Sequence, residues 1–278
     1  MKQKIWLVVI FFCLLGGCMQ EKKVPSSGTA EKKPEATSEE TTDPSGLSNE
    51  MQAWWIRRMK DHEKPEAQDK IALNTYDAYY LAEGDREKKV MYLTFDCGYE
   101  NGYTEQMLDI LKKHKAKAIF FVTQPYIKDQ PELVKRMKKE GHLVGNHTVK
   151  HKSMPSLSDR EIKEELILCA EACKEATGYE MDPYVRPPMG EYSERTLQLC
   201  KNLGYKTIFW SMAYLDYDVD NQPGADYVIR HFEENYHNGA IPLIHNVSSS
   251  NAEALDQVLT NLEKEGFRFP SLKEMSVE

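Results

Sequence analysis

The 278-residue sequence lacks the features that mark several common protein classes. Its formal net charge is −8, and without an excess of basic residues we expect no nucleic-acid partner. Cysteine does not predict a disulfide framework, because Cys169 and Cys173 lie on the apolar face of an expected helix and are expected to be core residues. That helix opens with Ser158 and Glu161 in capping-box positions. No G-x-S-x-G segment occurs, which disfavours a serine hydrolase.

Long apolar runs are also scarce, and the one at residues 5–15 is too short for a membrane-spanning helix. Lys2 and Lys4 precede it, as in an export signal, so we expect residues 1–17 to be removed. The "LGGC" that ends at Cys18 resembles a bacterial lipobox, which predicts a lipid anchor on Cys18 and a lipoprotein at the outer face of the cytoplasmic membrane. The alternative is a plain secretory signal with an incidental cysteine.

The rest of the chain divides by composition into three parts. Residues 18–50 are rich in Glu, Lys, Ser, Thr and Pro and have almost no large apolar side chains, which predicts a disordered tether. A leading segment, 51–88, is expected to form a short helical element that packs on the main domain. Residues 89–278 are long enough for one well-packed core.

In this last part, short β-rich runs alternate with amphipathic helical stretches, which predicts an α/β fold with a parallel barrel or a doubly wound sheet. In both architectures functional groups gather at the carboxyl ends of the strands. The expected strands are 90–95, 118–123, 142–146, 184–187, 206–211, 240–245 and 267–269, and the expected helices are 104–114, 130–139, 158–176, 193–203, 223–237 and 251–265.

Residue types that bind metal, move protons or steady charge follow five of these strands. We therefore expect one mouth of the barrel to carry a functional site. The candidates are Asp96 and Cys97, His147 and His151, Arg186, Asp216, and His245.

The two histidines of "NHTVKH" raise the question of a metal site. Residues four apart lie on the same side of a helical turn, so His147 and His151 could reach a single ion. The alternative for this pair alone is two solvated histidines. The metal interpretation therefore depends on the other candidates at the same mouth.

At these candidates the sequence resembles the NodB-type polysaccharide deacetylases, whose ordered motifs have counterparts in "TFDCGYENG", "HTVKH", "RPPMG", "LDY" and "LIH". It is most similar to the subgroup called delta-lactam-biosynthetic de-N-acetylases of spore-forming bacteria, which also has counterparts of the paired Trp54 and Trp55. The resemblance implies a distorted (β/α)7 barrel. It also implies a hydrolase that removes the N-acetyl group from a peptidoglycan sugar, N-acetylmuramic acid, with a divalent metal ion. We expect zinc as that ion and a monomeric protein.

The resemblance also implies a role for each matching position. Asp96 would be the general base, oriented by Arg186, and His245 the general acid, supported by Asp216. The metal would be held by His147 and His151. Substrate contacts would come from Tyr217, Leu243 and Pro187.

Cys97 departs from the family pattern, because most members have an aspartate there that completes the metal site. A thiolate is a good zinc ligand, so Cys97 is a candidate third ligand, and the alternative is a small neutral residue beside the site. Two alternatives to the expected function stay open. One is deacetylation of another glycan, such as chitin oligomers or acetylated xylan, and the other is a glycan-binding pseudoenzyme.

Overall fold

The structure is a computed structural model that describes residues 42–68, 70–82 and 89–276. The predicted signal sequence, Cys18 and most of the predicted tether lie outside these residues. No helix in the described part of the chain has both the length and the apolar character needed to cross a membrane. The predicted tether boundary at residue 50 falls within a segment that contacts the domain, because the side chain of Asn202 donates to Thr42 O and that of Asn49 to Pro155 O.

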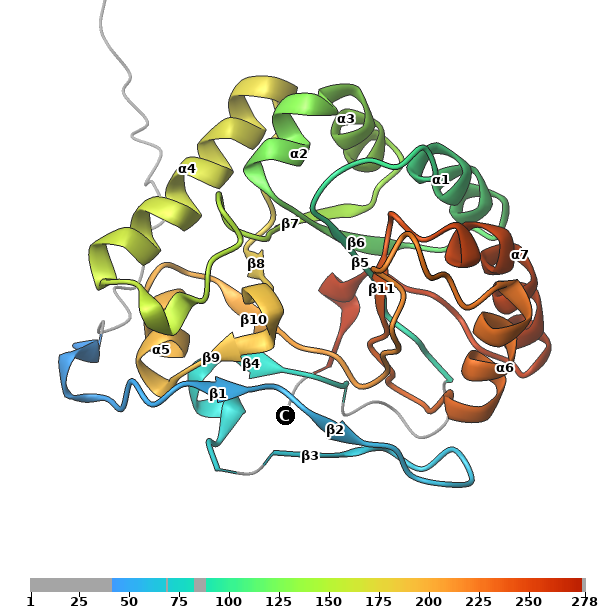
Figure 1. Cartoon of the computed structure of the whole chain (residues 1–278), viewed down its shortest axis with the longest axis horizontal. Helices are drawn as coiled ribbons and strands as arrows, with labels where there is room; N and C mark the ends of the chain where they lie inside the picture. The colour runs from blue at the N-terminus through green and yellow to red at the C-terminus, as the bar shows by residue number, and fades with distance from the viewer. Residues whose placement is uncertain (1–41, 69, 83–88, 277–278) are drawn as a thin grey trace, which may run out of the picture. The chain divides into compact units, whose positions relative to one another are not determined.

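A sheet of seven parallel strands forms the centre of the domain, in the order β11-β5-β6-β7-β8-β10-β4 (Figure 1). The predicted α/β class and the distorted barrel of seven strands are confirmed. The strands are β4 (Ala78–Tyr79), β5 (Leu93–Cys97), β6 (Ala118–Val122), β7 (Leu143–Asn146), β8 (Tyr184–Val185), β10 (Lys206–Ile208) and β11 (Leu243–His245).

Helices form an arc outside the sheet (Figure 1). They cover its outer face, and a second apolar cluster that includes Ile119 and Phe121 of β6 lies on the other face, so β5 and β6 are buried along their whole length. The predicted capping box of Ser158 and Glu161 is present at the start of α4. The helices are α1 (Thr104–Lys113), α2 (Gln124–Asp129), α3 (Pro131–Lys139), α4 (Asp159–Thr177), α5 (Glu194–Asn202), α6 (Ala225–Asn235) and α7 (Ser249–Lys264), with 3-10 turns η1 (Pro44–Gly46), η2 (Leu73–Tyr76), η3 (Met154–Ser156), η4 (Pro188–Gly190) and η5 (Leu272–Glu274).

The seventh strand is not the one that the sequence predicts. Residues 267–269 contribute only an isolated parallel bridge between Val90 and Arg268, and Pro270 follows directly. The seventh strand is instead β4, which pairs in parallel with β10. Strand β4 comes from the leading segment, so that segment is part of the barrel.

The prediction of a helical leading segment is wrong. The described residues of this segment form short strands and 3-10 turns. Strand β1 (Gln52–Ala53) pairs with β9 (Glu191–Tyr192), and β2 (Ile56–Arg57) pairs with β3 (Glu66–Ala67). Trp54 is buried and Trp55 is half exposed, the alternation of an extended chain. The Trp54 indole stacks on Phe209 at 4.6 Å between ring centroids and donates to Trp210 O, which fixes the segment to the end of β10.

The chain beyond β10 brings the sheet close to closure. Ser211 N donates to Ile241 O at 2.9 Å, and Leu243 N donates to Met212 O at 2.8 Å. These bonds join the segment after β10 to the one that enters β11, although the two strands lie far apart in the strand order. The carboxyl ends of the strands therefore surround a common mouth.

Candidate active site

The predicted functional residues lie at the carboxyl ends of the parallel strands. Asp96 is the second-last residue of β5, His147 directly follows β7, Arg186 follows β8, and His245 ends β11. Since His245 stands beside Asp96 in the strand register, two of these ends are direct neighbours.

Arg186 is completely buried beneath the mouth and holds Asp96 in place. Its Nη1 donates to Asp96 Oδ1 and to Thr94 Oγ1, both at 2.8 Å, and its other nitrogens donate to Ile208 O and Phe209 O. Burial raises the pKa of the Asp96 carboxyl, but the neighbouring charges, of which Arg186 contributes most, together with the hydrogen bond from Arg186 outweigh burial and leave that pKa below the usual value. Asp96 is therefore ionised near neutral pH and has a fixed orientation.

The imidazoles of His147 and His151 lie together, with 4.7 Å between their ring centroids. His147 Nδ1 donates to Arg186 O at 2.9 Å, which leaves its Nε2 facing Asp96 Oδ2 at 3.6 Å. Burial lowers the pKa of His147 to about 4 and also lowers the pKa of His151. Both rings are therefore neutral at pH 7, the form that binds a metal ion.

The segment that carries these histidines is a strained turn and not the helical turn that the spacing predicts. Thr148 and His151 have φ angles of 68° and 51°, in the left-handed region that is uncommon for residues other than glycine. Asn146 Oδ1 accepts from Thr148 N, and Glu165 Oε2 accepts from two successive backbone amides of the turn. Strain held by such contacts is typical of functional sites.

Cys97 does not join the histidines. Consecutive residues of a strand point to opposite faces, and Asp96 faces Arg186 while Cys97 lies with Leu93 and Phe95 in the main apolar cluster. Burial raises the pKa of the Cys97 thiol well above its usual value, so the side chain is a neutral thiol in the metal-free protein. The structure therefore does not support the prediction of Cys97 as a third ligand.

The donor set that remains is incomplete. Within residues 42–68, 70–82 and 89–276, no cluster of three or more His, Cys, Asp or Glu side chains is arranged to share an ion. Two neutral imidazoles beside the ionised Asp96 still fit a divalent ion that keeps open positions for water and substrate.

We expect Cys97→Ser to leave the metal content of the protein unchanged, because the side chain points into the apolar cluster. A hydroxyl without a partner in that cluster should lower the free energy of unfolding by roughly 1 to 3 kcal/mol. Elemental analysis and urea denaturation measure the two effects. A large loss of metal with unchanged stability would contradict this placement and restore Cys97 as a ligand.

His245 and Asp216 form a second polar pair at the mouth, next to Asp96. Asp216 is fully buried, its Oδ1 lies 2.6 Å from His245 Nδ1, and its Oδ2 accepts from His245 N at 2.8 Å. Burial lowers the pKa of His245, but the hydrogen bond and charge of Asp216 outweigh it and raise the pKa above its usual value. The neighbouring pairs thus favour opposite states: an ionised carboxylate at Asp96 and a protonated imidazole at His245.

The predicted substrate contacts differ in exposure. Tyr217 is 59% exposed, and its ring stands edge-on to His245 with 5.5 Å between centroids, so it lies at the rim of the mouth. Leu243 is partly exposed beside Thr94 in the register of β11 and β5. Pro187 is buried between Arg186 and η4, where it shapes the backbone.

Two supporting residues were missed by the sequence analysis. Thr94 bridges Arg186 and Pro242 O, and its position two residues before Asp96 on the same face could have indicated it. Glu165 lies on α4, far from the histidine turn in sequence, and no local pattern reveals its bonds to that turn.

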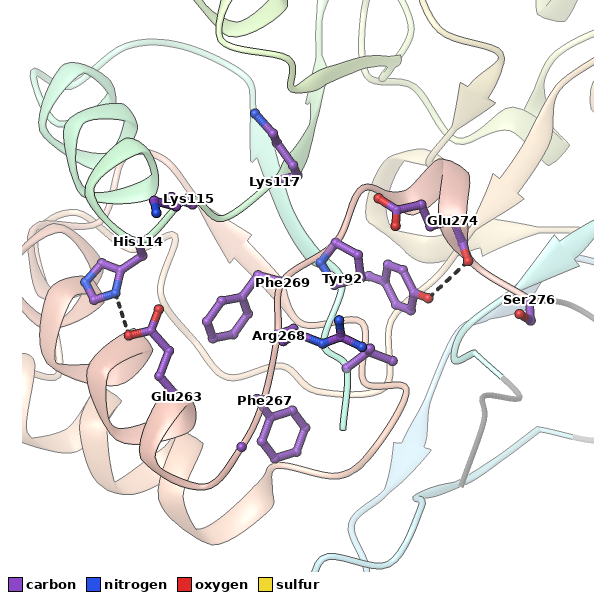
Figure 2. A pocket seen from close by; sticks show the side chains of 13 residues that line it. Tyr92, His114, Lys115, Lys117, Glu263, Phe267, Arg268, Phe269, Glu274 and Ser276 are labelled. Carbon is purple, nitrogen blue, oxygen red and sulfur yellow. Dashed lines mark hydrogen bonds and ion pairs between the residues drawn. The ribbon is translucent and has the colours of Figure 1, made fainter. Parts of the chain in front are cut away.

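An open cavity of about 930 Å³ lies at the other end of the strands. Its lining includes Tyr92 at the start of β5 and Lys117 just before β6, whereas Asp96 lies at the opposite end of β5. Figure 2 shows His114 turned toward Glu263, with 3.1 Å between Nδ1 and Oε2, and Tyr92 directed at the main chain of Glu274. None of the predicted site residues lines this cavity.

Comparisons with known proteins identify the relatives of this arrangement. The family model described as polysaccharide deacetylase matches residues 83–208. The chain is 44% identical to the peptidoglycan-N-acetylmuramic acid deacetylase PdaA of Bacillus subtilis, over 84% of this chain and 88% of that one. The solved structure of B. subtilis PdaA, a family 4 carbohydrate esterase, superposes with a TM-score of 0.79 at 43% identity and covers 82% of this chain and 98% of that one.

A more distant match is a pseudoenzyme of the same esterase family from Bacillus anthracis. Its structure is 29% identical with a TM-score of 0.65, over 71% of this chain and 68% of that one. Membership of the family therefore does not by itself establish activity. With the PdaA match extending over most of both chains and the family's motif residues gathered at one mouth, the chain belongs to the polysaccharide deacetylase family.

Proposed function

We propose that the protein is a metal-dependent hydrolase that removes the acetyl group from N-acetylmuramic acid in peptidoglycan. The observation that carries the proposal is the geometry at one mouth: the Asp96 carboxylate paired with Arg186 lies beside the His245 imidazole paired with Asp216, next to two further histidines. The match to PdaA supports the choice of N-acetylmuramic acid as substrate.

Asp96 is the proposed general base. An N-acetyl amide is a poor electrophile, so its hydrolysis needs a water from which a proton is withdrawn during attack. The ion pair with Arg186 holds the Asp96 carboxylate toward the mouth and limits its motion, because Arg186 is itself fixed by two main-chain carbonyls. The role of the Arg186 guanidinium in this proposal is to orient Asp96.

His147 and His151 are the proposed metal ligands, through imidazole nitrogens that their low pKa values keep unprotonated. A divalent ion bound there would polarise the acetyl carbonyl and make water more acidic. We propose zinc, because imidazole donors suit it and it accepts open coordination positions. Hydrogen bonding of His147 Nδ1 to Arg186 O sets the tautomer in which Nε2 is free to bind.

His245 is the proposed general acid that protonates the leaving amine. The raised pKa of this imidazole, maintained by Asp216, keeps a proton available near neutral pH. As the pH rises through that pKa, His245 loses its proton and turnover should fall. Tyr217, beside His245 and exposed at the rim, is placed to stack on a sugar ring of the glycan.

Acetate release from purified peptidoglycan tests the proposal. We expect the protein to release acetate from strands freed of stem peptides or from intact strands, and to leave muramic acid without its acetyl group. Chitin oligomers and acetylated xylan serve as comparison substrates. Release from chitin or xylan alone would contradict the proposed substrate.

The second candidate is a glycan-binding pseudoenzyme, favoured by the absence of a third metal ligand at Cys97 and by the inactive relative from B. anthracis. It predicts binding to peptidoglycan without acetate release at any metal supply. The ion-paired Asp96 and the dyad of His245 and Asp216 favour the enzyme, because glycan binding alone does not require them.

We also propose that the protein is anchored at the outer face of the cytoplasmic membrane by a lipid on Cys18. We expect Cys18→Ser to release the protein into the medium or to block its processing, because serine cannot take the thioether-linked lipid. Fractionation of cells that express each form is the measurement. A membrane fraction equal to that of the unaltered protein would refute the anchor.

A further inference from the structure

Asn251 lies in the first turn of α7 and is buried against the dyad of His245 and Asp216. Its Nδ2 donates to Asp216 Oδ2 at 2.7 Å and to His245 O at 3.2 Å. One amide group therefore contacts both members of the dyad. The two oxygens of Asp216 are thereby divided, with Oδ1 on the imidazole and Oδ2 on two nitrogen donors.

Tyr214 fixes the amide of Asn251 in this orientation. The Tyr214 hydroxyl forms a short hydrogen bond to Asn251 Oδ1, so the amide oxygen is engaged on the side away from Asp216. An ionised carboxylate only accepts hydrogen bonds, so the amide nitrogen must be the group that faces it. The ring of Tyr214 packs against His231, with 4.6 Å between centroids, which holds the hydroxyl in place.

The same turn of α7 also holds the backbone of the loop that carries Asp216. The side chain of Gln222 donates to Asp216 O and Asp218 O, and its oxygen accepts from Ser248 Oγ and Ser250 N. Residues 213–222 of this loop form no strand or helix and contain only short bends and turns. The position of Asp216 is therefore set by contacts with α7.

We propose that Asn251, held by Tyr214, is a positioning residue that fixes the carboxylate of Asp216 against His245. The inference rests on the proposed function, since it assigns a support to the proposed general acid. Without the Asn251 amide, the Asp216 carboxylate loses one of its three hydrogen bonds, and only contacts with His245 itself hold the two carboxylate oxygens. The imidazole then loses part of the interaction that raises its pKa against burial.

The test compares Asn251→Ala with the unaltered, metal-loaded protein on a peptidoglycan substrate. We expect kcat to fall about ten- to a hundredfold, the usual effect of removing a group that orients a functional side chain, with KM unchanged. We also expect the alkaline limb of the kcat profile to move to lower pH. The variant keeps every charged group that influences His245, namely Asp216, Asp96 and Arg186, so a shift of the limb reports a change in how Asp216 is held.

Asn261→Ala is the matched control, because Asn261 is also on α7 and also donates to a carboxylate, Glu233 Oε1 at 2.8 Å, away from the mouth. It should leave kcat and the pH profile unchanged. Tyr214→Phe removes only one hydroxyl and should shift the alkaline limb in the same direction by less. If Asn251→Ala fails to fold, this variant still tests the inference.

Three results would overturn the inference in an enzyme that is otherwise active. They are an unchanged kcat in both site variants, a loss of kcat without any shift of the alkaline limb, and an equal loss in Asn261→Ala. An inactive unaltered protein would instead contradict the proposed function. The two failures are therefore distinguishable in one series of assays.

Discussion

Asp96→Asn should lower acetate release by a factor on the order of 10² to 10⁴, the usual contribution of a positioned general base. Asparagine has the same shape and still accepts a hydrogen bond from Arg186, but it cannot take a proton from water. His147 and His151 stay in place, so the bound metal should be retained. Steady-state assays of acetate release, paired with elemental analysis, measure both quantities.

This substitution also leaves a buried guanidinium without its counterion, which costs stability independently of catalysis. Asp182→Asn separates the two effects. Asp182 is as buried as Asp96 and pairs with Lys138 at 2.7 Å, but it precedes β8 at the opposite end of the sheet. The Asp182→Asn variant should have a lower free energy of unfolding but a normal rate of acetate release per folded molecule. Comparable loss of turnover in both variants, or near-normal release by Asp96→Asn, would refute the role of Asp96.

The sequence was informative where function follows from strand position. A buried β-rich run places its last residues at one edge of a parallel sheet, and this rule alone brings Asp96, His147, Arg186 and His245 to one mouth. It needs no knowledge of how the strands pair. The local signals of helices, such as the capping box at Ser158, were equally dependable.

Non-local pairing was not predictable from the same patterns. Strand β4 has only two residues, and its place beside β10 depends on the packing of the leading segment around Trp54. Residues 267–269 have the composition of a strand, but they bury Phe267 and Phe269 with only one bridge. Helix α2 was missed because its six residues are too few for a periodic pattern.

The details of the site divide in the same way. Strand alternation predicts that Cys97 points to the face opposite Asp96, whereas the family resemblance predicts a ligand at this position. The partnership of Asp216 with His245 could not be derived from periodicity, because the loop of Asp216 has no regular structure and depends on Gln222 and α7. The turn with the left-handed backbone of His151 likewise depends on tertiary contacts, the bonds of two of its amides to Glu165.

Replacing both histidines of "NHTVKH" should abolish metal binding, from about one ion per chain to none, because a site with so few protein ligands cannot lose two imidazoles. His151 has a φ of 51°, so His151→Gly removes the ring together with the Cβ that strains this conformation, whereas alanine would keep that Cβ. The informative variant is therefore His147→Ala with His151→Gly. Metal content is measured by elemental analysis after dialysis against a weak chelator.

Lys150→Ala is the matched control, since Lys150 lies between the two histidines and only its backbone amide bonds to Glu165. It should bind metal normally. The double variant should also show no acetate release at any metal concentration, while its far-ultraviolet circular dichroism stays unchanged because neither ring belongs to the main apolar cluster. Full metal occupancy in the double variant would refute the proposed metal site, because the described residues offer no cluster of three ligands that could replace it.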